Sequence, residues 1–247
     1  LLLRQAPQDG SVRVRDVTGG TCCIGLWGPL ARDVLAEVTD DDVSHDGFGF
    51  FRARRIRVGA IDVLAMRLSY IGELGWELYT SADLGLALWD ALWDAGAAHG
   101  VRAVGRGAFD AMRIEKGYRS WGSDVWSEHT PEEAGLSFAV RAGKGDFTGR
   151  DALLDAPEPK QRLLPLVFDH LNDVVLGSEP VLRDGRAIGF VTSAAQGISV
   201  GRSIAYAWLP PDLEPGDRVE VAYLDRHYAA TVSDEPLFDP EMTRMRR

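Results

Sequence analysis

The chain has 247 residues, of which 45% are hydrophobic and 26% charged, and its formal net charge is −10. This length suffices for one large domain or two smaller ones with hydrophobic cores of their own. The acidic balance argues against a nucleic-acid or membrane-surface partner, and no apolar run approaches the roughly 20 residues that span a bilayer. The only cysteines, Cys22 and Cys23, are adjacent. Neighbouring strand residues point to opposite faces, so we expect no structural disulfide and a reducing compartment.

The sequence opens on Leu1-Leu2-Leu3-Arg4-Gln5 without an initiator methionine, and this stretch reads as the end of a helix. We therefore expect the chain to be a fragment of a longer polypeptide. Apolar periodicity and turn residues predict the elements that follow. In chain order these are a strand at 12–15, a strand at 21–26, a helix opened by Gly28-Pro29, a hairpin over 55–69 with its turn near Gly59, a helix capped by Ser81 and ended by Gly96 or Gly100, and a helix at 106–116 stopped by Gly117.

The most informative stretch is Ser69-Tyr70-Ile71-Gly72-Glu73-Leu74-Gly75-Trp76-Glu77-Leu78-Tyr79. Its two glycines suit a tight reversal, so the pattern predicts a strand, a turn and a returning strand. Tyr70 and Glu77 would then lie near one another on facing strands. An aromatic ring beside a carboxylate suits a planar ligand that carries paired N–H donors. The alternative is an ordinary hairpin with a core tryptophan and solvated glutamates.

A change of pattern near residue 155 predicts two domains. Mixed strands and helices make residues 1–155 an α+β domain, and Ala156-Pro157-Glu158-Pro159-Lys160 is a stiff, polar linker candidate. Short strands with turn residues between them then predict a small all-β, barrel-like domain over 161–247. The expected strands are 163–168, 180–183, 187–192, 203–208, 218–223 and 228–232, with a tight hairpin at Asp184-Gly185.

Other motifs are weaker. Gly197-Ile198-Ser199-Val200-Gly201 matches the serine-hydrolase pattern, but that motif needs a strand-to-helix elbow and a strand follows here. Gly105-Arg106-Gly107 lacks the third glycine of a dinucleotide site. The five histidines are scattered without metal-ligand spacing, so we expect no structural metal.

The stretch at 69–79 resembles the folate-binding motif of the aminomethyltransferase family, which includes the glycine-cleavage T-protein and the C-terminal half of dimethylglycine and sarcosine dehydrogenases. Further segments resemble the family in the same order along the chain. They are 104–119, 130–136, 144–150, 189–193 and 200–205. The resemblance implies an aminomethyltransferase-like folate-binding domain that is incomplete at its N-terminus, followed by the small barrel domain.

The resemblance also implies tetrahydrofolate as the ligand. Its pterin would stack near Tyr70, and the carboxylate of Glu77 would accept hydrogen bonds from the amino-pyrimidine edge. Glu73 is a weaker candidate because it lies on the turn, where a carboxylate can face solvent. Trp121 either faces the ligand or packs between the domains. The family's catalytic aspartate would lie upstream of Leu1, so no catalytic residue is assigned in this chain.

Phe109 stands where the T-protein branch has an arginine, and this departure favours the flavoprotein branch. That branch implies FAD on an upstream domain of the same polypeptide, which oxidises an N-methyl amine to an iminium. Tetrahydrofolate then captures the one-carbon unit as 5,10-methylenetetrahydrofolate. A stand-alone aminomethyltransferase and a non-catalytic, folate-binding regulatory protein are the alternatives. The expected location is the cytoplasm, or the mitochondrial matrix in a eukaryote.

Overall fold

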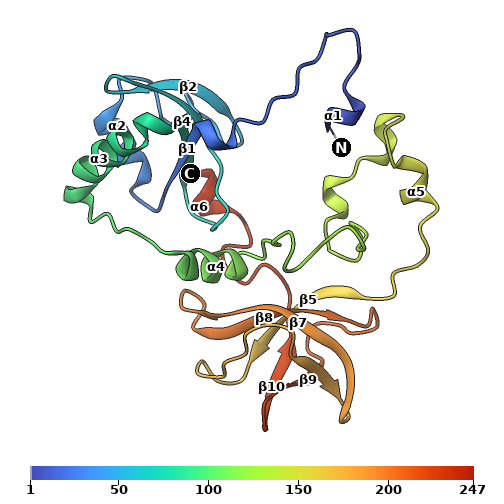
Figure 1. Ribbon diagram of the computed structural model, residues 1–247. Coiled ribbons are helices and arrows are strands. Elements are labelled where there is room, and N and C mark those ends of the chain that lie inside the picture. Colours follow the sequence, from blue (N-terminus) through green and yellow to red (C-terminus); the bar gives the residue numbers. More distant parts are fainter. Residues whose placement is uncertain (1) are drawn as a thin grey trace. The chain divides into compact units, whose positions relative to one another are not determined.

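The computed structural model describes residues 2–247, which divide into two compact units (Figure 1). The first unit contains residues 2–69, 73–102 and 244–247. The second contains residues 70–72 and 103–243. The two units are therefore interleaved along the sequence, and the expected division into 1–155, a linker at 156–160 and 161–247 stays a prediction.

A four-stranded antiparallel sheet forms the centre of the first unit, in the order β1-β4-β3-β2. The strands are β1 (Thr21–Trp27), β2 (Ala53–Val58), β3 (Ile61–Met66) and β4 (Gly75–Ser81), and the main helices are α2 (Ala31–Val38) and α3 (Gly85–Gly96). Short helices stand near the two ends of the chain, α1 (Leu2–Gln5) and α6 (Thr243–Arg246). The predicted hairpin at 55–69 and the helices after Gly28 and Ser81 are confirmed.

The alternation of side chains along β4 divides the sheet into two faces. Trp76, Leu78 and Thr80 are buried, and the first two join the core that α2 and α3 complete. Glu77 and Tyr79 point to the other face and are half-buried. The indole of Trp76 is fully buried and meets Phe48 edge-on at 6.1 Å. The expected core tryptophan of the motif is thus Trp76.

The turn before β4 differs from the expected hairpin. Tyr70 lies in the loop between β3 and β4 rather than on a strand, and Glu77 stands opposite Met66 of β3 and Gly25 of β1. The prediction that Tyr70 and Glu77 face each other across a strand pair is wrong, because β3 ends four residues before Tyr70. The loop turns at Gly72, where φ is +81°.

The strand predicted at 12–15 is also wrong. Residues 12–17 have no regular structure, and Val12 is 49% exposed. Alternation of apolar and charged residues produces a strand only where a neighbouring strand satisfies its backbone groups. No strand pairs with this segment within residues 2–247.

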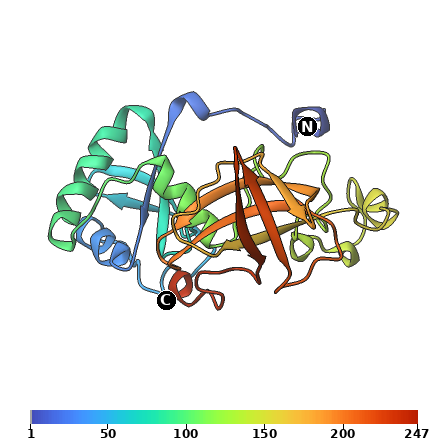
Figure 2. The ribbon, with the colours of Figure 1, turned by 90° about the horizontal axis from the view of Figure 1, so that it is seen from below.

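The second unit contains a closed β-barrel (Figure 2). Its strands follow the order β10-β5-β8-β7-β6-β9. The strands are β5 (Arg162–Phe168), β6 (Pro180–Arg183), β7 (Arg186–Gly197), β8 (Arg202–Leu209), β9 (Arg218–Tyr223) and β10 (Arg226–Val232), and helices α4 (Arg106–Glu115) and α5 (Arg150–Leu154) precede them. All six predicted strands are confirmed. The Asp184-Gly185 turn has φ of 53° and 72°, as a two-residue hairpin of this sequence requires.

Helix α4 packs against β7 and β8 on the outside of the barrel. Gly117 ends the helical turn with φ of +76°, as its position after the apolar pattern predicts. Ile114 of α4 is buried with Ile204, Tyr206 and Trp208 of β8 in a cluster separate from the barrel interior. The α+β class with a following all-β barrel is therefore confirmed. Within residues 2–247, no helix has the length and apolar character needed to cross a bilayer.

Replacing Gly75 by alanine tests the close approach of β4 to β1. A Cβ at this position would lie 2.1 Å from the carbonyl oxygen of Leu26 and 2.7 Å from Cα of Trp27, which are backbone atoms that cannot rotate away. We expect Gly75→Ala to lower the free energy of unfolding by about 3 kcal/mol, measured by urea denaturation.

Gly107→Ala is the matched control. A Cβ at Gly107 meets nothing within 4 Å, and alanine has a higher helix propensity than glycine at this position within α4. This variant should raise the free energy of unfolding by about 0.5–1 kcal/mol. Equal effects of the two alanines would contradict the packing described for Gly75.

Candidate functional site

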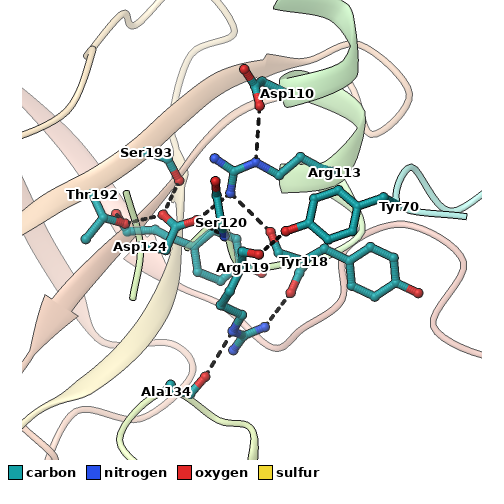
Figure 3. Close-up of polar contacts among 12 residues, drawn as sticks. Tyr70, Asp110, Arg113, Tyr118, Arg119, Ser120, Asp124, Ala134, Thr192 and Ser193 are labelled. Atoms are coloured by element: carbon teal, nitrogen blue, oxygen red, sulfur yellow. Dashed lines mark hydrogen bonds and ion pairs between the residues drawn. The ribbon is translucent and has the colours of Figure 1, made fainter. Parts of the chain in front are cut away.

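The polar cluster of the second unit is organised around the buried carboxylate of Asp124 (Figure 3). Asp124 is 1% exposed, and its Oδ2 lies 2.5 Å from Nη1 of Arg113 on α4. The same oxygen accepts a hydrogen bond from the backbone N–H of Ser120 at 2.8 Å. Oδ1 accepts hydrogen bonds from the hydroxyls of Thr192 and Ser193, each at 2.6 Å. One carboxylate thus joins helix α4, the turn after it and strand β7.

Arg113 is buried almost as deeply as its partner, at 3% exposure. Its Nη1 also donates to the carbonyl of Tyr118 at 3.1 Å, and its Nε lies 3.6 Å from Oδ1 of Asp110. The indole N–H of Trp208 donates to the carbonyl of Asp124 at 2.9 Å. Hydrogen bonds on both partners compensate for the desolvation of this buried ion pair.

Tyr70 packs onto this arrangement through its ring and its hydroxyl. The ring stacks on Phe109, with centroids 5.7 Å apart, and on Tyr118, at 5.4 Å. The hydroxyl donates to the backbone carbonyl of Arg119. Burial raises the pKa of Tyr70, so the phenol stays neutral in the physiological range. The sequence-predicted aromatic is therefore held by residues of α4 and of the turn that follows it.

Arg119 fixes the other side of that turn. Its guanidinium donates to the carbonyls of Ala134, at 3.0 Å, and of Gly117, and pairs with Glu235 at 2.5 Å. Burial opposes the charge of this group, but the pairing with Glu235 raises the pKa of Arg119 overall. Tyr206 donates to the second oxygen of Glu235 at 2.8 Å and lies 5.3 Å below the Arg119 guanidinium.

Glu77 belongs to the first unit and lies on β4. Its Oε2 accepts a hydrogen bond from the hydroxyl of Tyr79 at 2.5 Å. This hydrogen bond, followed by burial, raises the pKa of Tyr79. Among residues 2–247, no side chain or backbone group donates a hydrogen bond to Oε1 of Glu77. The carboxylate is thus half-buried, oriented by a neutral phenol, and able to accept N–H donors from a ligand.

Glu73 and Trp121 have different surroundings from Glu77. Glu73 does not face solvent as expected for a turn residue, because its side chain is only 14% exposed and pairs with Arg244 at 2.8 Å. Its Oε2 is buried and has no hydrogen-bond partner within residues 2–247. Trp121 is 73% exposed in the second unit, where its backbone forms an isolated bridge with Val125. Ligand contacts of both residues stay predictions.

Sequence reasoning missed Asp124, Arg113 and Arg119 as organising residues. Arg113 and Arg119 lie within the family-like stretch 104–119, which singled out the segment but not its buried side chains. Asp124 follows a Trp-Gly-Ser turn, a context typical of an exposed loop. Within the residues described, no cluster of His, Cys, Asp and Glu has the arrangement of a metal site.

Two models of known protein families match this chain. The GCVT N-terminal domain matches residues 1–144, and the Glycine cleavage T-protein C-terminal barrel domain matches residues 161–239. The chain belongs to the glycine cleavage T-protein family. The resemblance inferred from the motif at 69–79 and the segments after it is thereby confirmed.

Curated relatives of the family fall into two kinds. Rat mitochondrial dimethylglycine dehydrogenase is 38% identical over 95% of this chain, and 4-methylaminobutanoate oxidase (formaldehyde-forming) of Paenarthrobacter nicotinovorans is 34% identical over 99%. The aminomethyltransferase of Thermotoga neapolitana is 31% identical over 95% of this chain. The chain is thus homologous both to part of these large oxidoreductases and to stand-alone aminomethyltransferases.

This chain covers only part of the length of each of these relatives. This chain spans 28% of the length of the rat dehydrogenase, 30% of the P. nicotinovorans oxidase and 64% of the T. neapolitana enzyme. Among solved structures, the glycine cleavage system aminomethyltransferase T from Bartonella henselae superposes with a TM-score of 0.79 at 26% identity. That match covers 89% of this chain and 60% of the B. henselae chain.

Asp124→Asn tests whether the buried carboxylate holds the second unit together. The amide would keep the shape of the side chain but would leave the buried Arg113 guanidinium with only the partly exposed Asp110, 3.6 Å from its Nε, as a negative partner. We expect the free energy of unfolding to fall by about 3–5 kcal/mol, measured by urea denaturation.

Asp110→Asn serves as the control, since Asp110 contacts the same guanidinium from a side chain that is 33% exposed. Loss of the Asp110–Arg113 ion pair should lower the free energy of unfolding by about 1 kcal/mol or less. A loss for Asp124→Asn no greater than that of the control would contradict the organising role of Asp124.

Proposed function

We propose that this chain binds tetrahydrofolate and acts as the one-carbon acceptor part of an FAD-dependent oxidoreductase for N-methyl amino acids of the dimethylglycine or sarcosine type. The similarity to dimethylglycine dehydrogenase over 95% of the chain carries the proposal. The amine and the flavin would belong to the remainder of such a polypeptide. The product would be 5,10-methylenetetrahydrofolate.

The surroundings of Glu77 fit the ligand. An amino-pyrimidine edge presents parallel N–H donors, and a carboxylate accepts two such bonds side by side. Oε2 is already oriented by Tyr79, while no residue within 2–247 donates to Oε1. When bound, tetrahydrofolate supplies the nitrogen nucleophile that takes up the one-carbon unit. The chain's own task is to hold the pterin in one orientation and to limit its exposure to water.

We also propose that the folate contacts Tyr70, as part of the group of stacked rings to which this tyrosine belongs. Its ring faces are in contact with Phe109 and Tyr118, and its hydroxyl is occupied by the Arg119 carbonyl. A pterin near Tyr70 would therefore meet an ordered aromatic surface rather than a freely rotating ring. Phe109, which marks the flavoprotein branch in the sequence, is part of that surface.

A stand-alone aminomethyltransferase is the second candidate, because the T. neapolitana enzyme is 31% identical over 95% of this chain. Aminomethyl transfer from a lipoylated carrier protein would support it. A folate-binding regulatory protein without turnover is the third. Binding of tetrahydrofolate without product formation by the complete protein would support that alternative.

Glu77→Gln tests the folate site. The amide keeps one acceptor but replaces the other with N–H donors, which oppose those of the ligand. Loss of a charge-assisted hydrogen bond costs about 1.5–3 kcal/mol, so the dissociation constant for tetrahydrofolate should rise roughly tenfold or more. Isothermal titration calorimetry on the chain and the variant measures this change.

Glu132→Gln is a matched control, since it makes the same exchange at an exposed position of the second unit. It should leave tetrahydrofolate affinity unchanged. Equal affinity of the Glu77→Gln variant and the parent chain would remove Glu77 from the site. Absence of tetrahydrofolate binding by the parent, both alone and within the complete protein, would overturn the proposal.

A further inference from the structure

The sheet face that carries Glu77 has an aromatic residue of its own, Trp27 at the end of β1. Glu77 stands directly opposite Gly25 in the register of β1 and β4, and Trp27 follows Gly25 by two residues. Directly opposed residues of an antiparallel pair share a face of the sheet, and so do residues two apart on one strand. Glu77, Gly25 and Trp27 therefore lie on one face, opposite the face that carries Trp76 and Leu78 into the core.

The missing side chain of Gly25 makes room for the indole of Trp27. A Cβ at Gly25 would lie 2.1 Å from both Cη2 and Cζ3 of Trp27 and 2.8 Å from Cε3. The six-membered ring of the indole thus occupies the space that a side chain at position 25 would fill. Since Cβ atoms of directly opposed residues are about 4.5–5.5 Å apart, this ring lies beside the side chain of Glu77.

The indole is fixed in this position by its polar end. Nε1 of Trp27 donates to the backbone carbonyl of Leu68 at 3.1 Å, and both residues belong to the first unit. The N–H is thus used within the protein, and the ring presents an apolar aromatic surface next to the carboxylate. Trp27 and Glu77 are half-buried and Gly25 is exposed, so a ligand can reach this face of the sheet.

We propose that Trp27 forms an aromatic wall of the Glu77 site and contacts the pterin of tetrahydrofolate when Glu77 accepts its N–H donors. This inference rests on the proposed function and adds to it a residue from outside the motif at 69–79. Because the indole lies beside the Glu77 side chain, a bicyclic ring bound to that carboxylate comes into contact with it. Contact between two flat ring systems then fixes the plane of the pterin, while the carboxylate fixes its edge.

Trp27→Leu tests the aromatic contact. Leucine keeps an apolar side chain but removes the flat ring, so the dissociation constant for tetrahydrofolate should rise about threefold to tenfold. The measurement is calorimetric titration, without oxygen, of the complete protein that contains this chain. Trp93→Leu is the matched control, because Trp93 is an exposed tryptophan of α3 in the same unit, stacked on Trp89. It should leave the affinity unchanged.

Gly25→Ala tests the position of the ring without deleting a group that contacts the ligand. The new methyl group would require the indole to move, whereas Glu77 would keep its carboxylate and its hydrogen bond from Tyr79. Tetrahydrofolate affinity should again fall about threefold or more. Gly19→Ala, just before β1, is the control, since a Cβ there meets nothing within 4 Å. Gly25→Ala keeps the test decisive if Trp27→Leu does not fold.

The outcomes separate this inference from the proposed function. If the parent protein binds tetrahydrofolate and Glu77→Gln weakens that binding, unchanged affinity of Trp27→Leu would overturn the role of Trp27 alone. A loss of affinity in Trp93→Leu equal to that in Trp27→Leu would also overturn it. Absence of tetrahydrofolate binding by the parent protein would overturn the proposed function and this inference together.

Discussion

The ion pair between Arg113 and Asp124 is the interaction on which the second unit depends. A buried aspartate is costly unless every lone pair is used, and Asp124 receives an arginine, a backbone N–H and two hydroxyls. These donors come from α4, from the turn after α4 and from β7 of the barrel. Helix and barrel are thereby fixed relative to one another within the unit, and so is the turn that carries Tyr118 and Arg119.

That rigidity has a consequence for Tyr70. The loop between β3 and β4 has no strand partners of its own at Tyr70, yet the tyrosine is ordered by two stacked rings and by the carbonyl of Arg119. Its orientation is therefore set by α4 and its following turn, not by the hairpin. Glu77 is oriented by a separate device, the neutral phenol of Tyr79 two residues along the same strand. Tyr70 and Glu77 are thus each preorganised by their own surroundings.

The strands of the barrel were predictable because each is marked by a local sequence pattern. Short alternating segments between strong turn residues predicted the six strands, and Asp184-Gly185 took the positive φ angles that the tight hairpin needs. The same rule failed at 12–15, where alternation is present but no strand pairs with the segment.

The register near Tyr70 and the Asp124 cluster depend on tertiary contacts, which periodicity does not encode. Gly75 illustrates the difference. The sequence suggested that glycine is needed here for a tight turn. In the structure the reason is different, because the backbone of β1 passes too close to leave room for a Cβ. Likewise, the side chains that donate to the buried carboxylate of Asp124 come from residues 11 to 69 positions away in the chain. The family resemblance located the relevant segments, but it did not reveal the donors that hold them.

In the function proposed above, this chain receives a one-carbon unit on tetrahydrofolate. The most direct test uses the complete protein that contains the chain, turning over dimethylglycine or sarcosine with and without tetrahydrofolate, while released formaldehyde and 5,10-methylenetetrahydrofolate are quantified. We expect tetrahydrofolate to suppress formaldehyde release, and 5,10-methylenetetrahydrofolate to form in an amount equal to the formaldehyde that is no longer released. Formaldehyde release that is unaffected by tetrahydrofolate, with no methylene product above the uncatalysed background, would contradict it.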